Sequence, residues 1–402
     1  MGLEASQAVR KGTGGAAPLR RRRRPGVPYP AMSAPHVAVD LRALVPEETG
    51  IGVYTRALLL ELAGRKAFSY TGLAHRPPRG AEELTAAGIA TEEEAAPLGV
   101  LWQQLRLPRR LDRGDFDLLW SPLLTLPLRC PIPAVATVHD LTTLLLPETH
   151  RLKVKWSILP FLRPSLERAE RVVTISEASA RDIAFHFPQA AHKVRVVYPG
   201  IDPAFRPGTS AEIEAIRAEI GAPEGYVLYV GTLEPRKNLG ALLDAWEALH
   251  DENPHVPPLV LVGGYGWGSR HLVRRIAALA AKGVQALGHV DRGRLIRLFQ
   301  GARVFAYPSL YEGFGLPPAE AMACGIPTVV SDASSLPEVV GTAALRVPAG
   351  EPGALAQALY RVLQEPARAA ELAGRGIEQA RRFRWDRAAA EMEDVFREAA
   401  GR

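Results

Sequence analysis

The stretch S-L-Y-E-G-F-G-L-P-P-A-E-A-M-A-C-G, residues 309–325, follows an apolar run at 304–307 that is typical of a buried strand. Two glycines form a loop after that strand. The proline pair at 317–318 can then begin a helix, because the N–H that proline lacks would be unpaired in a first helical turn anyway. Strand, glycine loop and helix start together direct free backbone N–H groups and the positive end of a helix dipole toward one spot. The stretch therefore predicts an anion site in an α/β fold.

Two carboxylates accompany this expected anion site. Glu312 lies in the glycine loop, and we expect Glu320 in the first turn of the helix. Carboxylates would repel a phosphate, but they accept hydrogen bonds from hydroxyl groups. The pattern indicates a ligand that carries both a phosphate and a sugar. The alternative is a pair of surface glutamates beside a helix start.

The stretch resembles the donor-site signature of retaining glycosyltransferases of family 4, in which seven residues separate two glutamates. The flanking segments E-G-F-G-L-P and E-A-M-A-C-G match as well. The resemblance implies a GT-B fold, two Rossmann-like α/β domains facing across a cleft, with a C-terminal helix that crosses back to the first domain. It also implies that Glu312 orients the donor sugar and Glu320 holds the ribose. The resemblance further assigns donor-binding roles to Phe314, Gly315 and Leu316.

Length and composition agree with a two-domain protein. A chain of 402 residues can form two domains, and no apolar run approaches the roughly 20 residues of a membrane span. Two cysteines, Cys130 and Cys324, provide no disulfide framework and fit a reducing cytoplasm. We therefore expect a cytoplasmic protein.

The net charge of +6 does not indicate a nucleic-acid partner. Residues 1–31 contain seven basic side chains and one acidic one, which account for the whole excess. This tail is rich in Gly, Ala, Pro and Arg, so we expect it to be disordered. Met32, which precedes the first strand-like segment, is a candidate for the true start of the protein. The expected parts are a tail at 1–32, an acceptor-side domain at 33–199, a nucleotide-sugar-binding domain at 200–382 and a returning helix at 383–402.

The first half shows the pattern of a parallel, doubly wound sheet, because helical stretches separate several strand-like runs. The strands are expected from His36 and at 68–73, 117–120, 134–139, 171–176 and 194–198. The segment 198–207, dense in Pro and Gly, reads as the link to the second domain. Ser176 is expected to cap the helix that follows it.

Three residues of this half are candidate donor contacts. Gly50 and Gly52 are expected to form a turn before a helix, where a chain brings its backbone close to a ligand, although a plain turn fits equally well. The segment G-I-G-V-Y-T-R resembles the family's glycine loop that faces the donor diphosphate. His139 ends the strand A-V-A-T-V-H, and V-H-D-L resembles the segment whose histidine approaches the donor hexose. A satisfied structural histidine is the alternative.

The second half repeats the strand–helix pattern, with strands expected at 226–230, 259–262, 284–287, 304–307, 328–331 and 345–347. Its first strand leads into G-T-L-E-P-R-K-N, where Asn238 can cap the next helix. Arg236 and Lys237 therefore lie beside free N–H groups, which is an arrangement that neutralises a departing diphosphate without a metal. The alternative is a solvated basic turn. By resemblance these two cations hold the donor phosphates.

Three further residues are candidate donor contacts by resemblance alone. Gly231 begins the segment that carries the two cations, and Gly264 and His289 also lie at strand ends, near the expected nucleoside. The pair Asp115 and Asp117 is expected to flank a buried strand, away from any phosphate loop, so we assign no metal and no other cofactor.

Two stretches are both basic and apolar, at residues 101–113 and 151–156. Such segments can rest on anionic lipid, so a peripheral contact with the inner face of the cell membrane is one interpretation. A solvated helix face is the other. The sequence is silent on the acceptor, the linkage and the oligomeric state.

The expected reaction is the retaining, metal-independent transfer of a hexose from a nucleotide sugar to a glycan or a lipid-linked acceptor. V-H-D-L, G-T-L-E-P-R-K-N and S-S-L-P-E-V together look closest to bacterial mannosyltransferases of polysaccharide assembly. GDP-mannose is the first candidate donor and a UDP-sugar the second. The rivals are a nucleotide-sugar epimerase of the same fold and a non-catalytic sugar-nucleotide-binding subunit.

Overall fold

The computed structural model describes residues 34–45, 49–150, 152–266 and 270–401. The expectations for the tail, including its disorder and a start at Met32, lie outside the described residues.

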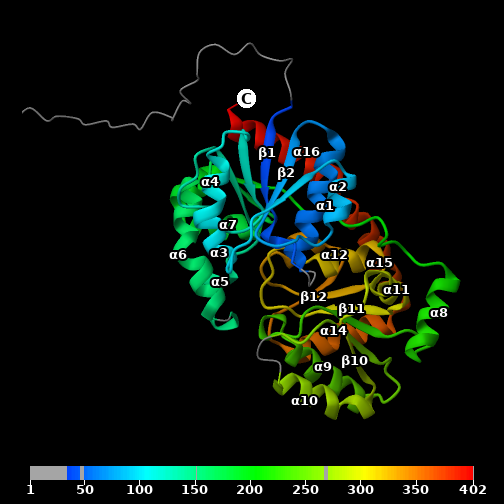
Figure 1. Cartoon of the computed structure of the whole chain (residues 1–402). Helices are drawn as coiled ribbons and strands as arrows, with labels where there is room; N and C mark the ends of the chain where they lie inside the picture. Colours follow the sequence, from blue (N-terminus) through cyan, green and yellow to red (C-terminus); the bar gives the residue numbers. More distant parts are fainter. Residues whose placement is uncertain (1–33, 46–48, 151, 267–269, 402) are drawn as a thin grey trace, which may run out of the picture. The chain divides into compact units, whose positions relative to one another are not determined.

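We call the part of the chain that carries the first sheet the N-terminal lobe (Figure 1). Within the described residues this sheet has seven parallel strands in the order β3-β2-β1-β4-β5-β6-β7. The strands are β1 His36–Asp40, β2 Ser69–Ala74, β3 Ala90–Glu93, β4 Leu118–Ser121, β5 Ala134–Val138, β6 Arg171–Thr174 and β7 Val194–Val196.

The C-terminal lobe carries a second parallel sheet, whose described strands run in the order β10-β9-β8-β11-β12-β13. Four of them are buried along their whole length, because helices cover both faces of a parallel sheet and leave no polar side. The strands are β8 Val227–Val230, β9 Leu259–Val262, β10 Val284–Gly288, β11 Val304–Tyr307, β12 Thr328–Ser331 and β13 Leu345–Val347.

Helices follow most strands in both lobes. Those of the N-terminal lobe, with η marking short 3-10 or π segments, are η1 Leu41–Ala43, α1 Gly50–Arg65, α2 Ala81–Ala86, α3 Gly99–Leu101, η2 Trp102–Arg106, α4 Leu107–Leu111, α5 Thr142–Leu145, η3 Pro147–Thr149, α6 Leu152–Arg168, α7 Glu177–His186 and η4 Pro188–Lys193. Those that follow are α8 Ser210–Ile220, η5 Pro235–Lys237, α9 Leu239–Glu252, α10 Arg270–Ala278, η6 Ala280–Lys282, α11 Arg292–Gly301, α12 Leu316–Ala323, α13 Leu336–Val340, α14 Pro352–Gln364, α15 Pro366–Ala380 and α16 Trp385–Ala400.

The order of the strands in each sheet shows where the expected ligand-binding loops lie. In both sheets the order reverses beside the first strand, at β1/β4 and at β8/β11, and doubly wound sheets bind ligands at the carboxyl ends of strands at such a point. The loop after β8 carries Arg236 and Lys237, and the loop after β11 carries Glu312. Because β8 and β11 are hydrogen-bonded neighbours, the two loops leave the sheet side by side.

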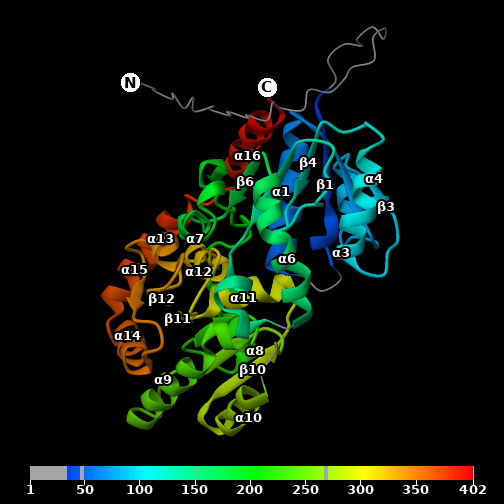
Figure 2. The same ribbon diagram turned by 90° about the vertical axis from the view of Figure 1, so that its left-hand side faces the viewer.

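The last helix, α16, crosses back to the N-terminal lobe, as the sequence predicts. It packs against α1 and against strands β4, β5 and β6 of the first sheet (Figures 1 and 2). Phe396 on its buried face contacts the rings of Phe68 and Trp120. The returning segment also runs beside the linker, since the N–H of Ile201 donates to the carbonyl of Phe383 over 3.0 Å.

The strand predictions hold with shifts of one or two residues at their ends, and one strand was missed. The missed strand is β3, at the edge of the first sheet, where most side chains face solvent. Its sequence, A-T-E-E, lacks the apolar run that marks the buried strands. An edge strand does not need that run, because its pairing partner fixes its backbone.

Candidate active site

Glu312 is the centre of the site at the β8/β11 switch point. Its Oε1 lies 2.6 Å from Lys237 Nζ, and its Oε2 lies 3.1 Å from Arg236 Nη1. Ser309 and Tyr307 also donate their hydroxyl protons to Oε1, over 2.6 and 2.9 Å. Lys237 and Glu312 are only 8% and 6% exposed, so each charge depends on the other for compensation.

The two loops are also joined through their backbones. The Arg236 guanidinium donates through Nη1 to the backbone carbonyl of Tyr311 over 2.7 Å, and Leu310 donates its N–H to the carbonyl of Arg236 over 2.9 Å. Glu234 pairs with the second guanidinium nitrogen of Arg236 at 2.9 Å. Both cations are therefore fixed in direction before any ligand arrives.

The pairing sets the charge state of the acid. Burial alone would raise the pKa of Glu312, but Lys237 and Arg236 outweigh burial and hold that pKa at about 2. Glu312 is therefore ionised at neutral pH. Three of the hydrogen bonds that Glu312 accepts go to Oε1. Among the described residues Arg236 alone donates to Oε2, so this oxygen has room for a further donor such as a sugar hydroxyl.

The loop after Glu312 is held in a shape that only glycine tolerates. Gly315 has a φ of 108° and precedes the first residue of α12, so the helix begins where the proline pair predicts. The Ser335 hydroxyl lies within hydrogen-bonding distance of two carbonyl oxygens, of Glu312 at 3.0 Å and of Phe314 at 2.7 Å, and Ser334 donates to the first of them. These serines belong to the S-S-L-P-E-V segment.

His139 reaches the same place from the N-terminal lobe. A Cβ on Gly313 would lie 2.5 Å from the carbonyl oxygen of His139, so the two lobes touch beside the acid. The His139 ring is buried, lies edge-on to Tyr54 with centroids 4.8 Å apart, and has Nε2 2.9 Å from the carbonyl of Pro122. Burial lowers the pKa of His139, so the ring is neutral at pH 7 and Nε2 carries its proton toward that carbonyl.

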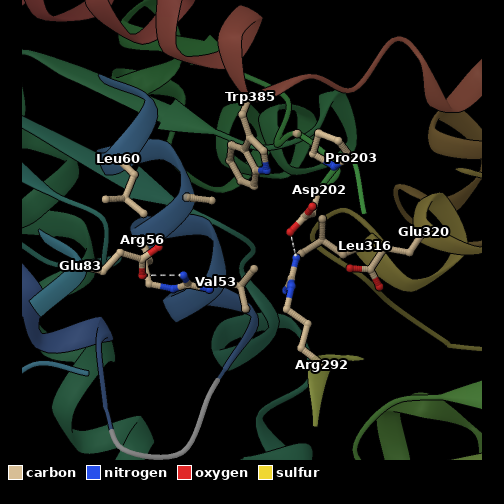
Figure 3. Close-up of a pocket in the computed structure, with 12 residues that line it drawn as sticks. Val53, Arg56, Leu60, Glu83, Asp202, Pro203, Arg292, Leu316, Glu320 and Trp385 are labelled. Carbon is tan, nitrogen blue, oxygen red and sulfur yellow. Dashed lines mark hydrogen bonds and ion pairs between the residues drawn. The ribbon is translucent and has the colours of Figure 1, made fainter. Parts of the chain in front are cut away.

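Glu320 faces a different space. It is half-buried on α12 and lines a cavity of about 230 Å³ together with the linker and α1. Figure 3 shows its carboxylate pointing toward the ion pair between Arg292 and Asp202. Burial raises the pKa of Glu320 to about 7, Arg292 acts against that rise, and Asp202 adds to it.

The sequence predicts Glu312 and Glu320 at one anion site, but the structure does not bring the two carboxylates into one cavity. The side chains of the salt-bridged cluster contact one another, and none of them lines the cavity of Glu320. The expectation that Glu320 lies in the first helical turn is also wrong. The helix begins at Leu316, which puts Glu320 in the second turn and directs it to the linker.

Two expectations about helix starts are corrected as well. Gly50 and Gly52 lie inside the first turn of α1, not in a loop before it, and Thr49 caps that helix by accepting from the N–H of Gly52 over 3.1 Å. Asn238 precedes α9 in a left-handed conformation with φ 54°, and its side chain makes no capping bond. The capping role of Ser176 is confirmed, because its side chain accepts from the N–H of Ser179 over 3.0 Å.

The remaining candidate donor contacts differ in burial and in position. The Phe314 side chain is buried between Tyr198 and Phe383, whereas Leu316 lines the cavity of Glu320. Gly231 and Gly264 follow β8 and β9. The exposed His289 follows β10.

The aspartate pair lies away from the site. Asp115 pairs with Arg110 at 2.9 Å, and Asp117 accepts from the N–H of His36 over 3.0 Å at the start of the first sheet.

Sequence reasoning missed three residues of the cluster. Tyr307 and Ser309 donate to Glu312, and Glu234 pairs with Arg236. Each lies within a segment that the sequence already singles out. Tyr307 ends a buried strand and Glu234 precedes the two cations. Their positions in those segments could therefore have identified them as members of the cluster.

Two facing Rossmann-like lobes with a returning C-terminal helix form the GT-B architecture of glycosyltransferases. Two family descriptions match the chain, "Glycosyltransferase Family 4" over residues 49–205 and "Glycosyl transferases group 1" over residues 212–383. The chain belongs to glycosyltransferase family 4, and it is a glycosyltransferase.

Two relatives illustrate the similarity in sequence. O-antigen chain mannosyltransferase B of Escherichia coli is 35% identical over 255 residues, which cover 63% of this chain and 67% of that protein. D-inositol 3-phosphate glycosyltransferase of Streptomyces bingchenggensis is 32% identical over 248 residues, which cover 58% of this chain and 53% of that protein. The match thus spans about half of the second relative's length.

Solved structures show the same fold. Anabaena HepE, determined in complex with UDP and glucose, has a TM-score of 0.72 at 22% identity and covers 90% of this chain and 99% of its own. Sucrose-phosphate synthase from Thermosynechococcus elongatus has a TM-score of 0.72 at 23% identity and covers 90% of this chain and 98% of its own. Among the helices of the described residues, none has the length and apolar character that crossing a membrane requires.

Proposed function

We propose that this glycosyltransferase moves a hexose, with retention of configuration and without a metal ion, from a nucleotide sugar to a glycan or a lipid-linked acceptor. GDP-mannose is the first candidate donor and a UDP-sugar the second. The similarity to an O-antigen mannosyltransferase supports the first, and the UDP in the structure of HepE keeps the second open. The observation that carries the proposal is the cluster of Arg236, Lys237 and Glu312 at the switch point.

The cluster suits the departure of a diphosphate. The bond between the sugar C1 and the phosphate oxygen breaks, and negative charge grows on the leaving group. Arg236 and Lys237 stabilise that charge from fixed positions, which requires no reorganisation during the reaction. The amino end of α12 adds the positive end of a helix dipole. Because Pro317 and Pro318 carry no N–H, a direct backbone donor there would be the N–H of Gly315 or Leu316.

Retention follows if the acceptor attacks from the face that the diphosphate leaves. Three donors occupy Oε1 of Glu312 and Arg236 pairs with Oε2, so the carboxylate is a poor covalent nucleophile and acts through the remaining capacity of Oε2 on a sugar hydroxyl. The acceptor oxygen then forms the new bond to C1, and its proton passes to the departing phosphate oxygen. His139 approaches the donor hexose, and Glu320 holds the ribose.

A panel of nucleotide sugars tests the proposal. The purified protein is incubated with each donor and a mixture of glycan acceptors, and the released nucleotide is measured together with the anomeric configuration of the product. Release that requires an acceptor and gives a retained anomer supports the proposal. Conversion of the donor with no acceptor present indicates an epimerase instead, and donor binding without turnover on any acceptor indicates a non-catalytic subunit.

A peripheral membrane contact is part of the same proposal, because lipid-linked acceptors lie at a membrane surface. At the start of α6, Leu152 and Trp156 are 70% and 75% exposed, and Lys155 lies beside them. Arg151 and the side chain of Lys153 lie outside the described part of the chain. In the other basic stretch Arg106 and Arg110 pair with glutamates, so it has less charge to offer a lipid.

Sedimentation with vesicles tests this contact. We expect the protein to pellet with anionic vesicles more than with neutral ones, and Trp156→Ala to reduce the difference. Tyr360→Ala, which removes a half-exposed ring from α14 of the other lobe, is the control. Equal pelleting of wild type and Trp156→Ala would remove α6 from the membrane contact.

A further inference from the structure

The segment between β5 and α6 contains a chain of polar side chains that none of the roles above uses. Asp140 follows His139 directly, and its Oδ1 accepts from the N–H of Thr142 over 2.8 Å and from the Thr142 hydroxyl over 2.5 Å. His150 returns to the same point after α5 and η3, with Nε2 3.1 Å from Thr142 Oγ1. Three side chains therefore form one hydrogen-bonded series.

The series fixes which nitrogen of His150 carries the proton. The Thr142 hydroxyl donates its single proton to Asp140, so Thr142 Oγ1 can only accept a hydrogen bond from the His150 ring. Nε2 is then the donor, and Nδ1 of the neutral ring is an acceptor. Within the described residues Nδ1 has no hydrogen-bond partner, and the ring is only half-buried.

The series begins beside the reaction centre. A Cβ on Gly313 would lie 3.2 Å from Asp140 Cβ, so the segment begins against the loop of Glu312. Asp140 also interacts electrostatically with Arg236. The charges of Arg236 and Glu234, both from the opposite lobe, act in turn on His150.

His150 is neutral at physiological pH. Burial lowers the pKa of its ring, and the surrounding charges largely oppose one another, since Asp140 and Glu234 favour the protonated ring while Arg236 and Lys155 disfavour it. A neutral imidazole with a fixed donor nitrogen presents a directional acceptor for a hydroxyl group.

We propose that Nδ1 of His150 binds a hydroxyl of the acceptor sugar and so positions the acceptor for attack. This inference rests on the proposed function, because it names a binding contact of the same site. The bound hydroxyl is one that does not react. The reacting hydroxyl forms the bond to C1 as the C1–phosphate bond breaks, and its proton goes to the leaving phosphate, so His150 is a positioning residue and gains no proton.

Four variants separate this role from a structural one. His150→Ala removes both contacts of the ring. His150→Asn places an amide oxygen near the position of Nδ1, whereas His150→Gln restores a donor to Thr142 near the position of Nε2. Thr142→Val breaks the series that orients the ring. Thr142→Ser, which keeps the hydroxyl, and His255→Ala, which removes an exposed histidine of the other lobe, are the matched controls.

The readouts use methyl α-mannoside as the acceptor probe. We expect His150→Ala and His150→Gln to raise the KM for this acceptor about tenfold, as the loss of one hydrogen bond implies, with kcat and the affinity for GDP or UDP unchanged. We expect His150→Asn to recover part of that loss. In ¹⁵N-histidine NMR of the nucleotide-bound protein, methyl α-mannoside should shift the Nδ1 resonance of His150 in wild type and in Thr142→Ser, but not in Thr142→Val.

Two results would overturn the inference while leaving the proposed function intact. They are an unchanged acceptor KM in His150→Ala, and wild-type turnover with no response of the Nδ1 resonance to the acceptor. A wild-type protein that binds nucleotide but transfers from no donor, with no Nδ1 response either, would overturn both. An Nδ1 response in a protein without turnover would support acceptor binding and count against the proposed reaction alone.

Discussion

Gly313 meets the carbonyl oxygen of His139 so closely that a Cβ there would lie 2.5 Å from it. The contact joins the loop of Glu312 to the strand end that carries His139, one from each lobe. Real Cβ atoms do not approach an oxygen to this distance, so any larger residue at position 313 must move one of the two backbones.

Gly313→Ala should therefore misplace the two halves of the site. We expect transfer to fall by about 10²-fold, because a displacement near 1 Å in a reacting geometry costs about that much. Steady-state kinetics with the best donor measure the change. Gly240→Ala is the control, since a Cβ at that position in α9 meets nothing within 4 Å and should leave the rate unchanged. A Gly313→Ala variant at wild-type rate would show that the lobes tolerate the displacement.

Lys237→Ala should abolish most of the transfer. Loss of one group that stabilises the developing charge typically lowers the rate about 10²- to 10³-fold. The variant also leaves Glu312 buried with Arg236 as its remaining cation, so its free energy of unfolding should fall by on the order of 3 kcal/mol. Kinetics and chemical denaturation measure the two effects separately.

Glu312→Gln combined with Lys237→Met distinguishes the two roles of the lysine. The double variant removes both buried charges, so it should recover much of the stability that Lys237→Ala loses while remaining inactive. Lys282→Ala, which removes a partly exposed lysine paired with Asp251 and Glu247, is the control for a lost surface charge. Recovery of activity in the double variant would exclude Lys237 from the chemistry.

Glu320→Gln should make the stability of the protein depend less on pH. The pKa of Glu320 is about 7 in the folded chain and near its usual 4.5 in the unfolded chain, so ionisation costs the folded state increasing free energy as pH rises from 4.5 through 7. The variant should match wild type at pH 4 and exceed it by about 3 kcal/mol at pH 8. Thermal unfolding across this range measures the difference, with Glu214→Gln on the exposed side of α8 as control. A constant difference at all pH values would contradict the assignment.

Transfer should persist in EDTA. The positive charge that a divalent cation would supply to the diphosphate is already present in Arg236 and Lys237, which are fixed by Glu234 and Glu312. The initial rate is compared in EDTA and in added Mg²⁺ or Mn²⁺. Strict dependence on either cation would contradict a metal-free site.

Much of the fold could be predicted from the sequence because buried parallel strands leave a strong signal. The runs V-L-Y-V, L-V-L-V and V-F-A-Y mark β8, β9 and β11 to within one residue. The edge strand β3 was missed because it buries too little to require apolar side chains. Helix starts were less predictable, since Gly50 and Asn238 adopt conformations that depend on packing beyond their own segments.

The sequence predicts which residues form the site better than it predicts how those residues are arranged. The neighbouring loops after β8 and β11 bring Arg236, Lys237 and Glu312 together, which the strand order alone implies. The separation of Glu320 from that cluster depends on the direction in which its side chain leaves α12, toward the linker and Arg292. The proline pair marks where the helix begins, but the sequence does not specify which face of the helix the linker covers.

The linker and the returning chain pass each other in contact. A Cβ on Gly200 would lie 2.3 Å from the backbone nitrogen of Trp385, and both residues line the cavity of Glu320. Two covalent crossings at one place hold this end of the two lobes together. A ligand in the cavity of Glu320 would therefore touch both crossings at once, so its binding would be felt by the two segments that join the lobes.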